Sequence, residues 1–391
     1  MRLLVIPSWY PPNGGMFFVN QTQWLADEGI SVAVVAAEEK SLKAMRLNRL
    51  FTDLTISVSK EFGLLTYRKA RFRIPTLNRI NAKRWIGAAI ELTERYIRDY
   101  GKPDLIQAHS AMWAGYVAAV IRKKYGIPFV ITEHRGRFNE NNFFRQREID
   151  PWHRPLIKEA LMSADAVIPV SERLVSVLEG IAGKRLPCRP LPNPVDERLF
   201  IPVEGVERPV DHTVFFSISN FQAYKATDVL IDAFHRVLQQ GVDASLRIAG
   251  EGRGRHNMEA YVRKLGLDNK VSFEGFQTPS EIRNLFGAVD FFVLSSFNEG
   301  QPVSVGEAAL CGKPVIATDV LSTNDIPEFA GRIVRTGSVE SLAEAMLTAV
   351  NTKKNYDPVA IRNFALTHFA RQVVIARITE VLKSVISTPA S

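Results

Sequence analysis

Cysteine is scarce in this chain of 391 residues, because only Cys188 and Cys311 occur. Neither lies in a Cys-x-x-Cys pair or beside a histidine cluster, so neither a disulfide framework nor a structural zinc site is indicated, and a reducing compartment fits best. Long apolar runs are also lacking, since no window approaches the roughly 20 unbroken apolar residues needed to span a bilayer. The apolar start, Met1 to Pro7, is too short for a secretory signal and predicts a buried first strand.

The composition is that of an ordinary folded protein. Hydrophobic residues make up 46% and charged residues 23% of the chain, which argues against a disordered chain or a fibre. The length exceeds that of one ordinary compact core. We therefore expect two domains.

Short apolar runs alternate with helical patterns, which is typical of βαβ units and a parallel sheet. In the first half we expect strands at 2–6, 31–36, 105–108, 128–132 and 166–169, with helices at 17–28, 114–125 and 173–181. In the second half we expect strands at 213–219, 245–249, 271–273, 291–294 and 314–317, with helices at 227–239, 257–265, 280–286 and 302–310. Each half reads as one Rossmann-like unit.

The segment 186–196 carries four prolines and cannot continue the interior of a sheet, so we place the linker between the domains there. The predicted amino-terminal domain is 1–192 and the predicted carboxy-terminal domain is 193–370. A long amphipathic run, Phe364 to Val385, predicts a last helix that packs across both domains, and its end, about 371–391, is expected to join the first one.

The segment from Ser295 to Gly312 is the most informative, because it runs from the end of a strand through a glycine-containing turn into a helix. Ligands of open α/β sheets bind at this end of the strands. Glu299 lies in the predicted loop and Glu307 in the second turn of a helix begun by Pro302, so both carboxylates are expected to face one crevice. Gly300 allows close approach to the backbone, and the amides of Gln301 to Val303 are expected to form a donor cluster for sugar hydroxyls or phosphate.

Two acids eight residues apart are common by chance, and an exposed pair is the plain alternative. The whole string, Glu299-Gly-x-Pro, Glu307-Ala-Ala and Gly312-Lys-Pro-Val-Ile-Ala-Thr, resembles the family-four retaining glycosyltransferases, whose signature is E-x7-E. The resemblance spans nearly the whole chain. It implies an α/β protein of the GT-B class, in which two Rossmann-like parallel-sheet domains face each other across a cleft.

The resemblance also implies roles for particular residues. Glu299 would meet hydroxyls of the donor sugar and Glu307 the nucleotide ribose, which suits carboxylates because each oxygen accepts two hydrogen bonds. Lys225 matches the family's diphosphate-binding lysine, but Asn220 stands where an arginine is usual, and a neutral amide cannot offset the charge of the leaving group. Arg253 or Arg255 is a candidate to compensate, with a solvated loop as the alternative.

In the first half, Gly14 and Gly15 lie between the first strand and the first helix, where the family places a glycine-rich loop beside the donor diphosphate and the acceptor. The string is not G-x-G-x-x-G, so a nicotinamide site is poorly supported. His134, in Thr132-Glu133-His134, resembles the family's histidine at the donor sugar, and His109, at the end of the preceding strand, is a candidate neighbour in the same cleft. Arg135 and Arg137 are candidates for an anionic acceptor or plain surface residues.

No Asp-x-Asp occurs, so the usual carboxylate motif that holds a divalent metal on a nucleotide sugar is missing, and we expect neither a metal nor a cofactor. The expected function is a retaining, metal-independent glycosyltransferase that uses a nucleotide-sugar donor and a glycan or lipid-linked acceptor in cell-envelope polysaccharide synthesis. A sugar-nucleotide epimerase and a non-catalytic nucleotide-sugar or polysaccharide binder are the alternatives. No nucleic-acid partner is expected.

The net charge of +8 is concentrated between Lys40 and Arg84, where twelve Lys and Arg face two acids, a local +10. Nucleic acid, an anionic membrane and an acidic substrate all suit such a stretch, and a solvated loop is the plain alternative. Apolar residues are interleaved with the charges (Leu47, Leu50, Phe51, Phe62, Leu64, Leu65, Tyr67, Phe72 and Ile74). We expect a cytoplasmic protein whose basic stretch docks on the inner face of an anionic membrane, with a lipid-linked acceptor.

Overall fold

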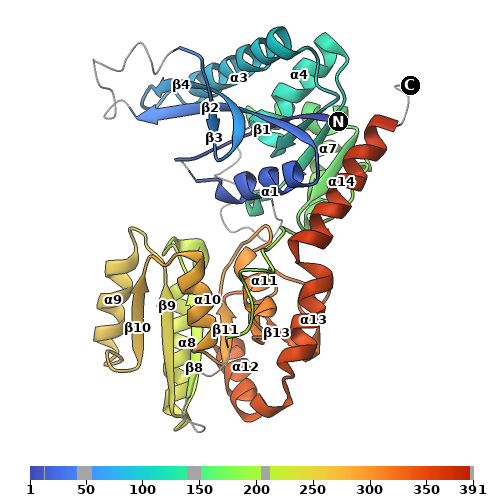
Figure 1. Cartoon of the computed structure of the whole chain (residues 1–391). Coiled ribbons are helices and arrows are strands. Elements are labelled where there is room, and N and C mark those ends of the chain that lie inside the picture. The colour runs from blue at the N-terminus through green and yellow to red at the C-terminus, as the bar shows by residue number, and fades with distance from the viewer. Residues whose placement is uncertain (13, 42–54, 139–150, 204–211, 388–391) are drawn as a thin grey trace. The chain divides into compact units, whose positions relative to one another are not determined.

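The computed structural model describes residues 1–12, 14–41, 55–138, 151–203 and 212–387. Within these ranges the chain divides into two compact units. Unit 1 comprises residues 1–138, 151–192 and 375–387, and unit 2 comprises the described residues from 193 to 374. The two units are described separately below (Figure 1).

Unit 1 is built on a sheet that contains seven strands in the described residues, in the order β3-β4-β2-β1-β5-β6-β7. All neighbours pair in parallel except β3 and β4, which form an antiparallel hairpin. The strands are β1 (Arg2–Pro7), β2 (Ser31–Ser41), β3 (Ser57–Glu61), β4 (Leu64–Arg73), β5 (Leu105–His109), β6 (Phe129–Glu133) and β7 (Ala166–Pro169).

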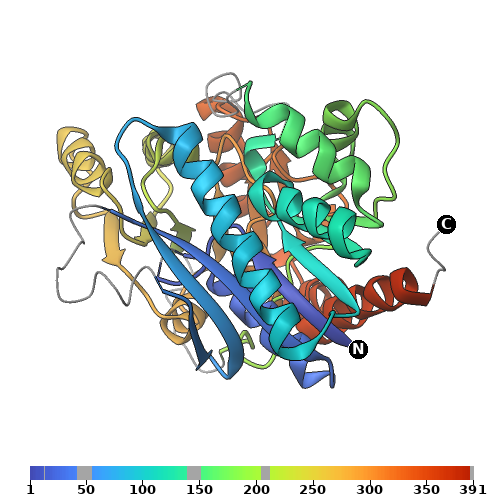
Figure 2. The ribbon, with the colours of Figure 1, turned by 90° about the horizontal axis from the view of Figure 1, so that it is seen from above.

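Helices cover both faces of this sheet, with α1 on one face and α3 and α4 on the other (Figure 1). The long helix α3 crosses β2 and β4, as the view from above shows (Figure 2). The helices are α1 (Met16–Asp27), α3 (Asn78–Tyr100), α4 (Tyr116–Tyr125), α6 (His153–Ser163) and α7 (Glu172–Ala182). The sheet order reverses direction between β1 and β5, so their carboxyl ends flank the crevice where ligands of such sheets bind.

Unit 2 repeats the plan with an all-parallel sheet that contains six strands in the described residues, in the order β10-β9-β8-β11-β12-β13. The strands are β8 (Thr213–Ile218), β9 (Ala244–Ala249), β10 (Val271–Gly275), β11 (Phe291–Leu294), β12 (Val315–Thr318) and β13 (Gly331–Val334). The helices are α8 (Thr227–Gln239), α9 (Arg255–Lys264), α10 (Pro279–Gly287), α11 (Val303–Leu310), α12 (Val339–Asn351) and α13 (Pro358–His368).

Adjacent phenylalanines show why both faces of the second sheet are covered. Phe215 and Phe291 pack into one apolar core with α8 and α12, while Phe216 and Phe292 pack into another with α10, α11 and α13. Successive strand residues point to opposite faces, so a pair of apolar neighbours requires a core on each side. The prediction of two parallel-sheet α/β units is confirmed.

The predicted single helix from Phe364 to Val385 is wrong. The structure has two helices there, α13 and α14 (Arg371–Ser387), with a break at Phe369 and Ala370. Val195 causes the break, because its N–H donates to the carbonyl of Phe369 at 2.9 Å and its carbonyl accepts from the N–H of Arg371 at 2.8 Å. A backbone that pairs with a neighbouring segment cannot complete helical hydrogen bonds at the same positions.

The basic stretch from Lys40 to Arg84 is largely structured rather than an open loop. Its described part contains the hairpin β3–β4 and the start of α3, while Leu47, Leu50 and Phe51 lie outside the described residues. Leu64, Tyr67 and Phe72 are buried in unit 1, so the expectation that these side chains lie against a membrane is wrong. Successive residues of a strand point to opposite faces of the sheet, so a strand that lies under α3 buries every second side chain. This alternation explains why apolar residues are interleaved with charged ones in the sequence.

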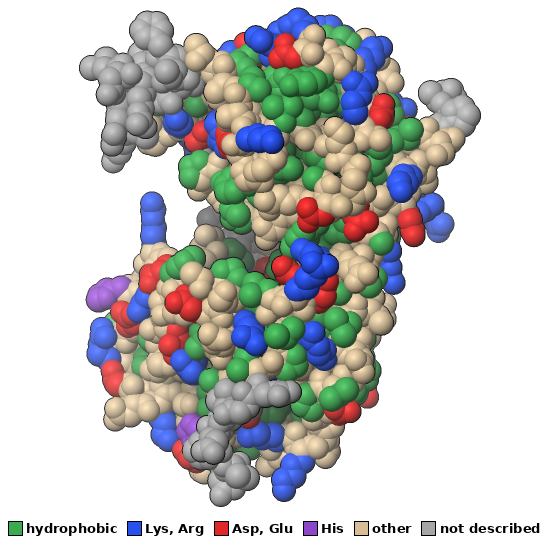
Figure 3. Space-filling model, in the orientation of Figure 1, with side chains coloured by type: hydrophobic (Ala, Val, Ile, Leu, Met, Phe, Trp, Pro, Cys, Tyr) green, Lys and Arg blue, Asp and Glu red, His purple; other side chains and the backbone are tan. Residues whose placement is uncertain are grey.

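Several cations of the stretch are also engaged within unit 1. Arg68 pairs with Glu38 at 3.1 Å and with Glu61 at 2.5 Å, and Lys69 pairs with Glu91. On the face of unit 1 shown in Figure 3, the basic side chains outside the grey atoms are scattered among other residues rather than gathered. Part of the positive charge of this stretch therefore forms ion pairs that join β4 to β2, β3 and α3.

Candidate functional site

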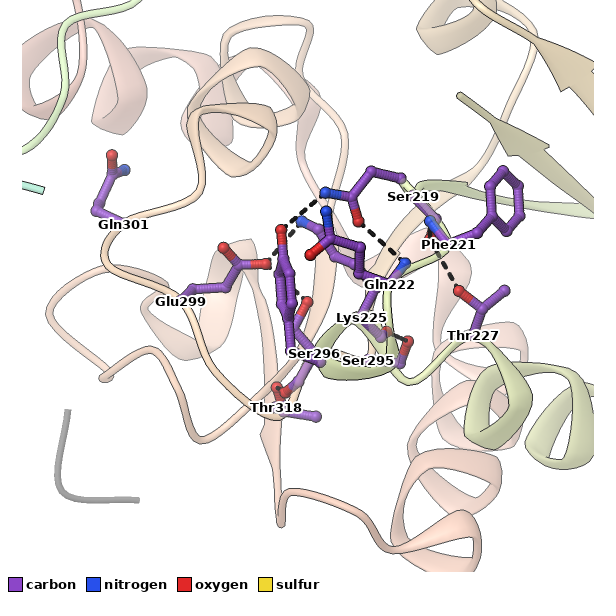
Figure 4. A network of polar contacts seen from close by, with 12 residues as sticks. Ser219, Phe221, Gln222, Lys225, Thr227, Ser295, Ser296, Glu299, Gln301 and Thr318 are labelled. Carbon is purple, nitrogen blue, oxygen red and sulfur yellow. Dashed lines mark hydrogen bonds and ion pairs between the residues drawn. The ribbon is translucent and has the colours of Figure 1, made fainter. Parts of the chain in front are cut away.

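The candidate site of unit 2 lies where the order of its sheet reverses, between β8 and β11. The loop after β8 carries Asn220 and Lys225, and the loop after β11 carries Glu299. The sheet brings these two loops together although Lys225 and Glu299 are 74 residues apart in the sequence. Figure 4 shows the polar network that joins them.

The centre of this network is an ion pair between Lys225 and Glu299. Lys225 Nζ donates to Glu299 Oε1 at 2.7 Å, and the two side chains are only 16% and 14% exposed. The hydroxyl of Ser296 donates to the same Oε1 at 2.8 Å. Burial opposes the charge on Lys225, but Glu299 outweighs it and raises the pKa of the ammonium group above its ordinary value. The Lys225 ammonium group is therefore charged at neutral pH.

The loop around Lys225 is held in a strained shape. Phe221 and Ala226 have φ angles of 54° and 47°, which side chains other than glycine seldom adopt. Hydrogen bonds fix the shape, because the hydroxyls of Ser219 and Thr227 lie 2.8 Å apart and Ser295 Oγ donates to the Lys225 carbonyl at 2.9 Å. Strain maintained by surrounding contacts is a frequent property of binding sites.

Asn220 is engaged inside the loop. Its Nδ2 donates to the Tyr224 hydroxyl at 2.8 Å, and its Oδ1 accepts from the Gln222 N–H at 3.2 Å. The residue that replaces the family's arginine thus shapes the loop. The backbone of Asn220 is also crowded, since a Cβ on Gly252 would lie 1.9 Å from its carbonyl oxygen. Gly252 is therefore required for the loop after β9 to pack here.

The two arginines expected near the diphosphate differ in their contacts with the described residues. Arg255 donates to Glu259 at 2.7 Å and also pairs with Glu251. Arg253 is exposed and makes no hydrogen bond or ion pair with any residue that the structure describes. Arg253 is thus the arginine with a guanidinium available to a ligand.

Glu307 lies on α11 and is half-buried. Its carboxyl makes no hydrogen bond with the described residues, and burial raises its pKa to about 7 from an ordinary value of 4.5. A desolvated carboxylate without partners gains from a ligand that donates hydrogen bonds, such as a pair of vicinal hydroxyls.

The start of α11 differs in detail from the prediction. Pro302 precedes the helix instead of beginning it, and Val303 is the first helical residue. Proline has no N–H, so Pro302 adds no donor to the expected cluster, which leaves the amides of Gln301 and Val303. The side chain of Gln301 is 5% exposed and accepts from the Asn193 N–H at 3.2 Å, so it anchors the segment that enters unit 2. Gly300, directly before it, is buried.

Unit 1 has its own cluster at the carboxyl ends of β5 and β6. His109 Nδ1 and His134 Nε2 lie 3.0 Å apart, so one ring donates a hydrogen bond to the other. His109 is fully buried, and burial, together with the neighbouring His134, holds its pKa well below the usual range. The neutral form of His109 is therefore the stable one. His134 is half-buried and packs against the rings of Phe17 and Phe18 at 5.0 Å.

Glu133 is a residue whose role the sequence did not reveal. It is fully buried, and its two oxygens accept from the N–H groups of Ala111, His134 and Arg135 and from the Ser110 hydroxyl, at 2.7–3.1 Å. It thereby joins the loops after β5 and β6. The sequence hints at this role only in one way. An acid, Glu133, ends one strand, and a hydroxyl side chain, Ser110, follows the neighbouring strand.

The remaining predicted residues of unit 1 divide into three cases. Gly14 and Gly15 have φ angles of 85° and 87°, and a Cβ on Gly15 would lie 2.9 Å from the Trp9 carbonyl oxygen, so the loop before α1 requires glycine. Arg135 is buried with its guanidinium 4.6 Å from the Trp9 ring, so it is not a surface residue. The side chain of Arg137 lies outside the described residues.

Comparison with known families gives two matches that together span most of the chain. The family described as "Glycosyltransferase Family 4" matches residues 14–199, and the family described as "Glycosyl transferases group 1" matches residues 204–362. Among curated proteins, the chain is 26% identical over 364 residues to TuaC of Bacillus subtilis, whose name assigns it to teichuronic acid biosynthesis as a glycosyltransferase. That match covers 88% of each protein.

Solved structures show the same fold. A sucrose-phosphate synthase from Thermosynechococcus elongatus aligns with a TM-score of 0.81 at 20% identity, covering 99% of this chain and 100% of that one. HepE of Anabaena, solved in complex with UDP, aligns with a TM-score of 0.70 at 18% identity, covering 98% of this chain and 100% of that one.

A second curated relative is a D-inositol 3-phosphate glycosyltransferase from Kribbella flavida. It is 25% identical, and the match covers 85% of this chain and 81% of that protein.

Proposed function

Since this chain belongs to the family-four glycosyltransferases of the GT-B fold, we propose that it moves a sugar from a nucleotide-sugar donor to a glycan or lipid-linked acceptor with retention of configuration. Glycosyltransferase activity follows from the family. The donor, the acceptor and the retaining course are the proposal. The observation that carries it is the ion pair of Lys225 and Glu299 at the point where the sheet of unit 2 reverses.

The contacts of the two residues suggest how a donor is held. The Lys225 ammonium group is charged and lies beside a strained loop, where a diphosphate would replace Glu299 as its partner. Glu299, released from Lys225 but still bonded to Ser296, would accept from hydroxyls of the sugar. The carboxyl of Glu307, which has no hydrogen bond with the residues described, suits the ribose, and the amides of Gln301 and Val303 add donors near the helix start.

In the proposed reaction, the bond between the anomeric carbon and the diphosphate oxygen breaks while the acceptor oxygen bonds to the same face of the sugar. The acceptor hydroxyl passes its proton to the leaving phosphate, so no separate base is required. Lys225 and Arg253 offset the charge that develops on the leaving group. His134 would contact the donor sugar from unit 1.

We propose that this chemistry proceeds without a metal or cofactor. The sequence lacks Asp-x-Asp, and the described ranges contain no group of three or more His, Cys, Asp or Glu side chains suited to a metal ion. The leaving group's charge is instead met by Lys225, Arg253 and the helix start.

The setting we propose is cell-envelope polysaccharide synthesis at the cytoplasmic face of a membrane. The name of the Bacillus subtilis relative, which refers to teichuronic acid, supports this setting. No helix in the described ranges has the length and apolar character to cross a bilayer. The burial of Leu64 and Tyr67 makes the proposed contact with anionic lipid an electrostatic one, carried by the basic stretch without apolar insertion.

A thermal-shift screen tests the donor site. A ligand that binds only the folded protein raises its melting temperature by mass action. UDP and UDP-glucose are the first probes, because HepE was solved with UDP and with UDP-glucose, and other nucleoside diphosphates follow. We expect one nucleotide class to stabilise the wild type and to lose most of that effect in Lys225→Ala. A shift equal in the variant, or no shift with any nucleotide, contradicts the proposed donor site.

A further inference from the structure

Unit 1 contains a pocket that none of the sequence motifs predicted. Its volume is about 240 Å³, and it is lined by residues that follow β1, by the second half of β2, by α3 and by the turn after β5. The residues that carry the argument are Trp9, Tyr10, Glu38, Glu39, Trp85 and Trp113. The pocket thus lies at the point where the sheet order of unit 1 reverses, which is where open α/β sheets bind ligands.

Aromatic rings form much of the lining and are held in fixed positions. Trp85 is buried, donates from Nε1 to the Ala37 carbonyl at 2.9 Å, and packs against Trp113 with ring centroids 5.5 Å apart. The Trp9 ring packs against Phe18 at 4.9 Å. Trp113 has a φ angle of 66°, which an L side chain rarely adopts, so the turn holds its indole in place against a conformational cost.

Two hydrogen-bond donors of the lining have no partner within the described part of the chain. Tyr10 is 4% exposed, and neither its hydroxyl nor the Nε1 of Trp113 forms a hydrogen bond with any described residue, although both atoms are buried. The Thr66 hydroxyl lies near Tyr10 but donates to the Leu64 carbonyl instead. A buried polar group without a partner costs roughly 1–3 kcal/mol, so a ligand that accepts hydrogen bonds would recover this energy.

Two carboxylates supply the complementary acceptors. Glu38 is paired with Arg68 through Oε2, which leaves Oε1 without a hydrogen bond among the described residues. Glu39 is half-buried and makes no hydrogen bond with them, and burial raises the pKa of its carboxyl. The lining itself includes neither Lys nor Arg. An anionic ligand therefore finds carboxylates here and no direct cation.

We infer that this pocket binds a single uncharged, hydroxyl-rich sugar ring of the acceptor. Sugar hydroxyls both donate and accept, which matches two free donors and two carboxylates, while the apolar face of a pyranose packs against indole rings. The pocket is smaller than the 300–1,000 Å³ typical of larger ligands, which suits one ring. The inference that a sugar binds here depends only on the pocket. The inference that this sugar is the acceptor rests on the proposed function.

A quaternary ammonium ion is the main competing ligand, because aromatic rings and carboxylates also attract such cations. The hydrogen-bond donors of Tyr10 and Trp113, which have no partner among the described residues, disfavour binding of such a cation. A quaternary ammonium group has no hydrogen-bond acceptor to offer them. This difference makes the two ligands separable by experiment.

The test uses the full-length protein and saturation-transfer NMR with the methyl glycosides of glucose, galactose, mannose and N-acetylglucosamine, together with methyl glucuronide and choline. We expect at least one neutral glycoside to bind, and methyl glucuronide and choline not to bind. Binding of choline or of the glucuronide in preference to all neutral glycosides, or binding of no glycoside, overturns the inference.

Tyr10→Phe is the decisive variant, because it removes a hydroxyl that has no hydrogen-bond partner among the described residues. We expect the affinity for the neutral glycoside to fall about tenfold while the unfolding midpoint stays the same or rises. Tyr67→Phe is the matched control, since the Tyr67 hydroxyl donates to Asp99 at 2.8 Å, and its removal should lower stability without changing glycoside binding. Equal affinity in Tyr10→Phe and wild type, or a loss in both variants, contradicts the assignment.

Failure of the pocket and failure of the proposed function give different results. The same Tyr10→Phe protein should keep the wild-type thermal shift with the nucleotide that stabilises unit 2. Nucleotide binding without any glycoside binding contradicts the pocket alone. Glycoside binding that depends on Tyr10, without binding of any nucleotide, contradicts the donor site and leaves the pocket in place.

Discussion

Lys225 and Glu299 form an ion pair of 2.7 Å across the two loops that end β8 and β11. Each is the partner that the other needs in the absence of a ligand, because an unpaired charge at this depth is costly. A donor that brings both a diphosphate and sugar hydroxyls can replace this pair with two new sets of contacts. The ion pair therefore keeps both side chains in position before the donor arrives.

Exchanging one partner at a time should separate their roles. Glu299→Gln frees Lys225, so we expect affinity for a nucleoside diphosphate to be kept or increased while transfer falls by roughly 100-fold or more. Lys225→Ala should reduce both diphosphate affinity and transfer. Calorimetric titration and turnover at saturating donor measure the two effects, and near wild-type turnover in either variant contradicts its assigned role.

Lys270→Ala is the matched control for this pair. Lys270 forms an ion pair of 2.9 Å with Asp243 in the same unit, but both residues are more exposed and lie at the amino ends of β10 and β9. We expect nucleotide affinity and turnover to stay at the wild-type level. A comparable loss in Lys270→Ala would mean that any broken ion pair of unit 2 disturbs the site.

The raised pKa of Glu307 should appear in the stability of the protein. Below about pH 4.5 the carboxyl is protonated in both states, and as the pH rises to about 7 only the unfolded state ionises freely, so the folded state loses stability. Glu307→Gln lacks this loss. We expect the variant to match the wild type near pH 4.5 and to be more stable by about 1 kcal/mol at pH 8, after allowance for contact with solvent.

Urea unfolding at pH 4.5 and pH 8 measures this difference. Glu344→Gln, the same change at an exposed position of α12, is the control and should show none. Nucleotide affinity should also fall in Glu307→Gln, most strongly above pH 7 where the wild-type carboxylate is charged. A wild-type affinity in the variant at pH 8 counts against a contact with the ribose.

Arg253 and Arg255 should respond differently to truncation. Arg253→Ala removes a guanidinium that has no partner among the described residues, so we expect diphosphate affinity to fall about three- to tenfold with unchanged stability. Arg255→Ala breaks contacts with Glu251 and Glu259 and should cost roughly 0.5–1 kcal/mol of unfolding free energy with little effect on the ligand. The reverse result would move the compensating role to Arg255.

The sequence predicted regular elements well and long-range pairs poorly. The bounds expected for α8 and β11, 227–239 and 291–294, are those observed, because their apolar periodicity is strong and turn residues flank them. The hairpin β3–β4 is visible in the sequence only as a basic stretch, since the pairing of Lys69 and Arg71 with Glu91 depends on the packing of α3 over the strand. Charge along the sequence does not show which charges will be neutralised.

Functional residues could likewise be predicted one by one from the sequence, whereas their contacts with each other could not. Motif spacing selected Glu299 and Lys225, but not their contact, which depends on the pairing of β8 with β11. It selected His134, but not Glu133, whose four hydrogen bonds come from two loops. No sequence motif marks the pocket of unit 1, because the order of the sheet is what brings together Trp9, Glu39, Trp85 and Trp113.

Membrane docking should depend on charge alone. We expect sedimentation with vesicles to increase with the fraction of anionic lipid and to be largely lost at roughly 0.5 M salt, where screening is short. Substituting Phe62, an exposed side chain of this stretch, by Ser should not change it. Binding that ignores lipid charge and salt, or no binding to anionic vesicles, contradicts the proposed docking.

Product analysis tests the central claim most directly. The nucleotide sugar identified by thermal shift is incubated in EDTA with and without the neutral glycoside that binds unit 1, and the products are analysed by mass spectrometry and by NMR of the anomeric proton. The account predicts a longer glycoside that keeps the donor's anomeric configuration, with release of nucleoside diphosphate that Glu299→Gln abolishes. An altered nucleotide sugar formed without any acceptor, an inverted linkage, a requirement for added metal, or an unchanged donor would contradict it.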